Sequence, residues 1–249
     1  MTNYTKKIPL EQECIQLIIK AFEDGEHDYV ENFREHPTVT RNGRGAAIWN
    51  NINTHLVKLF SNERFKSDKI SRGPWELIYI FDTKTKYLYT FMRDANFINL
   101  HKGGADNHLF HYSNVLSRIN SQLLGLYVPQ YQQLSLVNKI SIDAETDVRL
   151  EELLKQMVYS IEEKIERYAI VLVDSKQCTV NKIQCVIPVA YCEPMYCEDW
   201  SEFINPEYAL VEYFVEETMP NAEESALYEL NLDINLSVRS NEGKEEKIN

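Results

Sequence analysis

Residues 75–92 read WELIYIFDTKTKYLYTFM. Two runs of aromatic and branched apolar residues, Trp75–Phe81 and Tyr87–Met92, flank the short polar stretch DTKTK. Such residues suit a pleated, half-buried surface, and a polar connection of this length joins neighbouring antiparallel strands. The stretch therefore predicts a β-hairpin. Tyr168–Val173 and Cys178–Ile187, joined by DSKQ, predict a second hairpin of the same kind.

Between and before these hairpins, apolar residues recur every three or four positions, which is the period of an amphipathic helix. Gly25 offers a stop for the first of these helices, and Asp143 offers an N-cap for the last. Acidic residues early in the last helix, and Lys164 and Arg167 near its expected end, agree with the helix dipole. The four apolar stripes run from Leu10 to Ala21, from Ile48 to Leu59, from Tyr112 to Leu123 and from Leu150 to Ile165.

Near the C-terminus, apolar residues occupy the even positions from Tyr228 to Val238, while mostly polar residues occupy the odd ones. This alternation predicts a half-buried C-terminal strand. The chain is therefore expected to be an α+β protein of amphipathic helices, two antiparallel hairpins and a C-terminal strand.

Charge divides the chain unevenly. Residues 1–125 contain 16 Lys and Arg against 14 Asp and Glu, whereas residues 126–249 contain 10 against 24, for an overall net charge of -12. The basic segment, Arg34–Lys102, has a net charge of +6, and the acidic segment, Ile183–Val238, has 12 acidic residues and no Lys or Arg. We therefore expect a mildly basic α+β region over residues 1–125, an acidic α+β region over 126–239 and a frayed tail over 240–249.

Several classes of protein and site fit the sequence poorly. No apolar run approaches the roughly 18 residues that a membrane-spanning helix needs, and Glu11 and Glu13 lie where a signal peptide would be apolar, so we expect a cytoplasmic protein without membrane contact. The five cysteines have no zinc-binding spacing and predict reduced thiols. Nucleophile and phosphate-loop motifs are also lacking, so no catalytic residue is predicted.

His101, His108 and His111 form a cluster near Asp94 and Asp106. Two imidazoles on one helical turn can present themselves to a divalent metal, and a carboxylate can complete such a site. The spacing matches no established zinc signature, so we predict neither a metal nor another cofactor. A metal-dependent hydrolase or nuclease remains the second alternative function.

The basic segment allows a different reading, as a nucleic-acid interface. Arg41 and Arg44 precede a predicted helix, and Lys66, Lys69 and Arg72 precede a hairpin, an order compatible with a winged helix that grips phosphates. The acidic remainder of the chain would repel DNA at long range. A DNA-binding transcriptional regulator is therefore the first alternative, and direct binding to nucleic acid is not the leading expectation.

The acidic segment favours another kind of partner. Carboxylates held on an ordered surface without neutralising neighbours produce a negative field, which speeds encounter with a basic protein, and exposed aromatic side chains can anchor the contact. A nucleic-acid-handling protein has such a basic surface. The residues predicted to form the contact are Glu198, Asp199, Trp200, Glu202, Glu212 and Glu216.

The stretch RGPWELIYIFDTKTKYLYTFMRDANF, Arg72–Phe97, resembles a block of an uncharacterised family of Gram-positive bacterial and phage-related proteins. The stretch DWSEFI, Asp199–Ile204, is similar to a second block of that family. The resemblance covers about residues 10–204 and implies a bacterial or phage setting, but no activity and no catalytic residue. Together with the charge pattern it leads us to expect a non-enzymatic regulator or inhibitor of another protein, of the antitoxin or phage counter-defence type.

Overall fold

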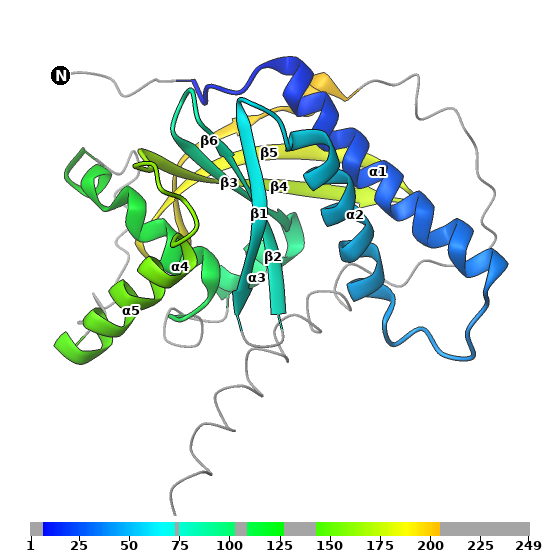
Figure 1. Ribbon diagram of the computed structural model, residues 1–249, viewed down its shortest axis with the longest axis horizontal. Coiled ribbons are helices and arrows are strands. Elements are labelled where there is room, and N and C mark those ends of the chain that lie inside the picture. The colour runs from blue at the N-terminus through cyan, green and yellow to red at the C-terminus, as the bar shows by residue number, and fades with distance from the viewer. Residues whose placement is uncertain (1–6, 73–74, 103–108, 127–142, 205–249) are drawn as a thin grey trace, which may run out of the picture. The chain divides into compact units, whose positions relative to one another are not determined.

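A six-stranded sheet organises the computed structural model, which describes residues 7–72, 75–102, 109–126 and 143–204 (Figure 1). All of these residues belong to one unit, Met1–Tyr213, while a second unit, Phe214–Asn249, lies outside the described residues. The strands lie side by side in chain order: β1 (Phe65–Arg72), β2 (Trp75–Asp82), β3 (Tyr87–Arg93), β4 (Arg167–Lys176), β5 (Thr179–Val189) and β6 (Glu193–Asp199).

Both predicted hairpins are confirmed, β2 with β3 and β4 with β5. The two hairpins meet through β3 and β4, which run parallel from Tyr87↔Arg167 to Arg93↔Val173. A purely antiparallel sheet would follow from the hairpins alone, but the long connection between β3 and β4 allows the chain to return to the same end of the sheet. The sheet is therefore mixed, within an α+β fold as expected.

The parallel pair β3–β4 joins strands from the two sides of the boundary in charge between residues 125 and 126. β3 belongs to the basic N-terminal region and β4 to the acidic C-terminal region, yet the two strands pair over their whole common length. The two regions consequently share one sheet, and the division by charge does not separate two bodies within the described residues.

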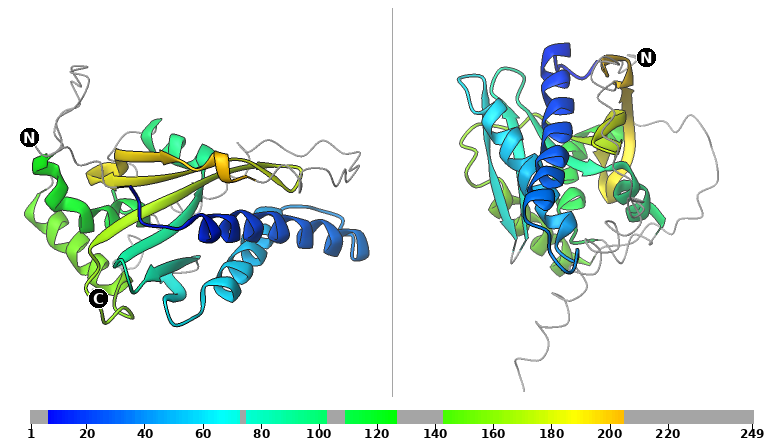
Figure 2. Two further views of the ribbon diagram at one scale, coloured as in Figure 1. Left: turned by 90° about the horizontal axis from the view of Figure 1, so that it is seen from above. Right: turned by 90° about the vertical axis from the view of Figure 1, so that its right-hand side faces the viewer.

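Helices cover both faces of this sheet (Figures 1 and 2). Because β4 is covered on both sides, it is apolar without interruption from Tyr168 to Val173: Ala169, Val171 and Val173 face one core, and Tyr168, Ile170 and Leu172 face the other. The first core lies under α1 (Gln12–Glu35) and α2 (Arg44–Phe60), and the second lies under α3 (Asp94–Lys102), α4 (Tyr112–Ser117) and α5 (Ala144–Met157). The 3-10 helix η2 (Arg118–Leu126) contributes Leu123 to the first core and Ile119 to the second.

The predicted helices exist, but three of them end at other residues than expected. The stripe from Tyr112 to Leu123 is α-helical only to Ser117 and continues as the 3-10 helix η2. α1 continues ten residues beyond Gly25, which lies at the contact with α2: a Cβ atom there would come within 2.6 Å of the Ile52 backbone nitrogen. The glycine therefore serves close packing and does not end the helix. Later in the chain, α5 stops at Met157, before the end of its apolar stripe, so Ile161 and Ile165 pack from the segment that connects α5 to β4.

The N-cap of α5 is confirmed, because the Asp143 carboxylate accepts a hydrogen bond from the Thr146 backbone N–H at 2.7 Å. Apart from short 3-10 helices, the strands β1 and β6 and the helix α3 have no counterpart in the prediction. β6, with the sequence EPMYCED, is short, charged and partly exposed, so it lacks the apolar alternation that reveals a strand. The predicted strand at Tyr228–Val238 and the tail at 240–249 lie outside the described residues. Within the described part of the chain, no helix is long and apolar enough to cross a membrane.

Candidate functional site: the acidic edge of the sheet

The described part of the predicted contact surface lies at one edge of the sheet, on β6 and the short 3-10 helix η4 (Ser201–Phe203) that follows it. Glu198 and Asp199 belong to β6, Trp200 links the two elements, and Glu202 belongs to η4. Glu212 and Glu216 lie outside the described residues. Four of the six predicted contact residues thus lie at one edge of the sheet, at the end of β6 and in the 3-10 helix that follows it.

Glu198 is engaged inside the protein. Its carboxylate accepts hydrogen bonds from the Ile8 backbone N–H at 2.6 Å, the Tyr196 hydroxyl at 2.8 Å and the Trp200 indole N–H at 3.1 Å. Burial, and then the bond to this carboxylate, raise the pKa of Tyr196 to about 12. Glu198 ties the start of the described chain to the end of β6, so its role is to hold the edge in place.

Trp200 cannot be an exposed anchor, which corrects the prediction. Only 2% of its surface is exposed, and it packs in the core beneath α1. Its backbone N–H donates to the Ile183 carbonyl at 2.9 Å, which continues the β5–β6 ladder by one residue. A large aromatic ring gains more from complete burial than from partial exposure, so it anchors the edge to the core.

Three carboxylates remain on the outside, those of Glu193, Asp199 and Glu202. Asp199 accepts the Ser201 backbone N–H at 2.9 Å, and the bonds from this serine, with Lys182 nearby, lower the pKa of the carboxyl group. None of the three forms an ion pair with a lysine or arginine of the described chain. We call these three residues on their strand and 3-10 helix the acidic edge.

By comparison, the described basic side chains of β1 and of the β2–β3 turn form ion pairs with carboxylates. Lys66 and Lys86 both bind Glu163, the former at 3.0 Å, and Lys69 binds Glu76 at 2.6 Å. Arg72 lies in β1, and its side chain is outside the described part. The lysines predicted to bind phosphates are thus paired with carboxylates of their own chain.

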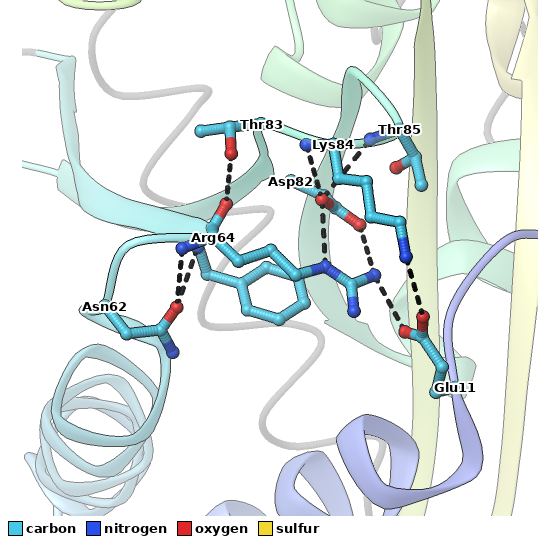
Figure 3. Close-up of polar contacts among 8 residues, drawn as sticks. Glu11, Asn62, Arg64, Asp82, Thr83, Lys84 and Thr85 are labelled. Carbon is cyan, nitrogen blue, oxygen red and sulfur yellow. Dashed lines mark hydrogen bonds and ion pairs between the residues drawn. The ribbon is translucent and has the colours of Figure 1, made fainter.

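Arg64 forms the most extensive of these pairs (Figure 3). Its guanidinium donates to both carboxylate oxygens of Asp82, at 3.2 and 2.7 Å, and lies 2.7 Å from Glu11, whose other oxygen is 4.0 Å from Lys84. Burial on its own raises the pKa of Asp82, but the bonds from Arg64 and the Lys84 backbone N–H outweigh it, and the pKa lies below its ordinary value. The cluster joins β1, the β2–β3 turn and the start of α1.

The winged-helix arrangement expected for the DNA-binding alternative does not form. β2 and β3 are interior strands, held between β1 and β4, so their hairpin is not a free wing. Arg41 and Arg44 instead lie against aromatic rings of α1. The Arg41 guanidinium carbon is 4.6 Å from the centre of the Phe33 ring, and that of Arg44 is 5.8 Å from the Tyr29 ring.

The histidine cluster does not assemble into a metal site within the described residues. His111 caps α4, where its ring Nδ1 accepts the Ser113 backbone N–H at 3.3 Å. His101 lies in α3 with its side chain outside the described part, as is the whole of His108. Asp94 instead binds Lys182 at 2.9 Å. In the ranges that the structure describes, no three metal-binding side chains converge.

All five cysteines are free thiols. Cys185 and Cys192 are buried, as small core residues are, while Cys197 is exposed on β6. Burial raises the pKa of Cys192 to about 11, and chiefly burial raises that of Cys178 to about 11. A thiol that holds its proton is a poor nucleophile, so these side chains serve packing.

Sequence reasoning missed one buried polar network, at the carboxyl ends of β3 and β4. There the Arg93 guanidinium binds the Glu26 carboxylate and the Ser175 hydroxyl, and Ser175 also binds Glu26. Glu26 is 5% exposed, and Arg93 lies over the rings of Phe22 and Trp49. The sequence held one signal of this network. Glu26, a charged residue, lies one helical turn after Phe22 on the otherwise apolar face of α1. The three groups satisfy one another, so the network fastens α1 to the sheet.

The family comparison completes the description of the site. The model of a family described as "Family of unknown function (DUF5986)" matches residues 7–249. No curated protein and no solved structure matches the chain. The match extends over the whole acidic edge and both hairpins, and it agrees with the resemblance to an uncharacterised family noted from residues 72–97 and 199–204. The chain belongs to the family DUF5986.

Proposed function

We propose that this protein binds and regulates another protein, and that the acidic edge contacts a basic surface of that partner. The observation that carries the proposal is a difference in ion pairing between the carboxylates of the acidic edge and the basic side chains near β1. Glu193, Asp199 and Glu202 form no ion pair with a lysine or arginine of the described chain, although Lys182, paired with Asp94, lies near Asp199. By the same measure, every lysine and arginine from 64 to 86 with a described side chain forms an ion pair with a carboxylate. Unpaired charge on a rigid edge favours encounter with a charge of opposite sign.

The internal contacts of the edge support this reading. Glu198 and Trp200 fasten the strand to the start of the chain and to the core, so the three exposed carboxylates are held by ordered backbone. Preorganised groups lose less conformational entropy when a partner binds. A nucleic-acid-handling protein offers the basic surface required, which keeps an inhibitor, antitoxin or phage counter-defence factor as the class of function proposed.

The test measures how the full chain binds two probes, a lysine-rich peptide and a DNA duplex. A fluorescent lysine-rich peptide should bind, and its affinity should fall steeply between about 50 and about 500 mM salt as screening shortens the reach of the field. Neutralising all three carboxylates, with Glu193→Gln, Asp199→Asn and Glu202→Gln, should weaken binding by about tenfold, at about 0.5 kcal/mol for each exposed charge pair.

A control of equal charge change uses three exposed carboxylates elsewhere, with Glu35→Gln, Glu152→Gln and Glu162→Gln. This variant should bind the peptide almost as the natural protein does, because it keeps the acidic edge. Equal losses in the two triple variants would mean that net charge alone drives binding, and the proposal would fail. A duplex DNA probe should not bind; tight DNA binding that is lost with Arg41→Ala and Arg44→Ala would favour the alternative function.

A further inference from the structure

β6 is the last strand of the sheet, and the carboxylates of the acidic edge lie along and just beyond it. In the part of the chain that the structure describes, β6 pairs with β5 on one side and with no strand on the other. A strand at the rim of a sheet presents backbone N–H and C=O groups that can pair with another extended segment. The open side of β6 is therefore a potential template for a further strand.

The register shows which backbone groups face outward. The Trp200 N–H donates to the Ile183 carbonyl, and the ladder continues from Gln184↔Asp199 to Ile187↔Tyr196. In an antiparallel ladder, every second residue exchanges hydrogen bonds with the neighbouring strand, and the residues between turn their groups away. Tyr196 and Glu198 therefore face β5, while Cys197 and Asp199 direct their backbone groups to the open side.

The two rims of the sheet differ in charge. At the β1 rim, Lys66 and Lys69 are paired with Glu163 and Glu76. At the β6 rim, Glu193 and Asp199 form no ion pair within the described chain, since Lys182, which lies near Asp199, is paired with Asp94. Like charges directly opposite each other destabilise a strand pair, so a second copy of β6 is disfavoured, whereas a strand with lysine or arginine at alternate positions is favoured.

From this geometry we propose that the partner's basic segment binds as an added strand on β6, with backbone hydrogen bonds to Cys197 and Asp199, one cationic side chain beside Asp199 and another beyond the paired residues, near Glu193. This inference rests on the proposed function and specifies how the partner is held. Backbone pairing supplies affinity and the carboxylates supply specificity, as in other cases of strand addition. Pro194 lacks an N–H group, so the added strand pairs along residues 195–199.

Hydrogen exchange of the full chain tests the added strand directly. The probe is a short peptide of alternating lysine and valine, with a glutamate–valine peptide as its control. The amides of Cys197 and Asp199 should exchange freely in the unbound protein and at least about tenfold more slowly with the lysine peptide, because a hydrogen-bonded amide must open before it exchanges. Slow exchange in the unbound chain would overturn the inference, because the chain itself would then occupy the edge.

A pair of substitutions provides a second test. Cys197→Pro removes the outward N–H but leaves the bonds to β5, and should weaken peptide binding by about fivefold or more, as expected for one lost hydrogen bond. Cys197→Val keeps the N–H and should bind normally. Strand addition is wrong, and the proposed function stands, if three results occur together. The peptide binds through the three carboxylates, the amides of Cys197 and Asp199 exchange no more slowly in its presence, and Cys197→Pro binds it as the natural protein does. If the lysine peptide does not bind at all, both fall.

Discussion

Carboxylates at single positions have two different roles in this protein. Asp82, Glu26 and Glu198 are buried or half-buried, and each accepts two or more hydrogen bonds, at least one of them from a group far away in the sequence. Glu193 and Glu202 are exposed and unpaired within the described chain. A buried carboxylate without its partners would cost several kcal/mol, so the first group stabilises the fold, and the second is available to a partner.

Asp82 gives a prediction about pH. Its pKa is lower in the folded protein than in the unfolded chain, so its contribution to stability is fully present above about pH 4 and is lost as the pH falls through the folded value. Asp82→Asn should lower the free energy of unfolding at pH 7 by about 3 kcal/mol, since it leaves Arg64 without this partner.

The measurement is urea unfolding of both proteins from pH 7 downward. The difference between them should begin to narrow below about pH 4, where the Asp82 carboxyl group of the unfolded chain takes up a proton, and should vanish once the pH falls through the lower pKa of the folded protein. Asp174→Asn, at an exposed aspartate of β4, is the control and should change little. A gap between Asp82→Asn and the natural protein that stays constant down to pH 2 would contradict this role.

At the scale of elements, the packing of α1 on α2 depends on the absence of a side chain at Gly25. A Cβ atom there would lie 2.6 Å from the Ile52 backbone nitrogen and 2.7 Å from its Cγ1. Gly25→Ala should therefore destabilise the protein by about 1 to 3 kcal/mol, although alanine is intrinsically the better helix former. Because backbone atoms are in the way, α1 must shift.

Thermal or urea unfolding checks this prediction, with Gly43→Ala as the matched control. Gly43 precedes α2, and a Cβ atom there would meet nothing within 4 Å. The control should lose less than about 1 kcal/mol, as is usual for a changed helix cap. A stabilised Gly25→Ala protein would show that helix propensity outweighs the contact with Ile52.

At the scale of the unit formed by residues 1–213, the two halves that differ in charge fold as one sheet. Separating the chain after residue 125 would expose β3 and the part of β4 that pairs with it, residues 168–173, all of which are buried except Arg93 of β3. Fragments 1–125 and 126–249 should therefore each fail to show a cooperative thermal transition, and mixing them should restore one. Circular dichroism measures this, and cooperative unfolding of either fragment alone would contradict the shared sheet.

Some of the fold could be predicted from the chain because the signal was local. The hairpins at 75–92 and 168–187 and the N-cap at Asp143 depend on residues within a few positions of one another. β6 could not be predicted in this way, since its seven residues gain their strand conformation by pairing with β5 and not from their own apolar pattern. The same applies to Gly25, which resembles a helix stop until Ile52 is placed against it.

The candidate site shows the same difference between features that local sequence determines and features that depend on distant segments. The sequence by itself determined the α+β class, the two hairpins and the excess of carboxylates near the end of the described chain, because composition and short periodicities carry this information. Only the tertiary structure decided that Trp200 is core, that Glu198 is bonded internally, and that the lysines around β1 are neutralised by Glu76 and Glu163. Burial and ion pairing depend on segments up to 190 positions apart, which no local pattern records.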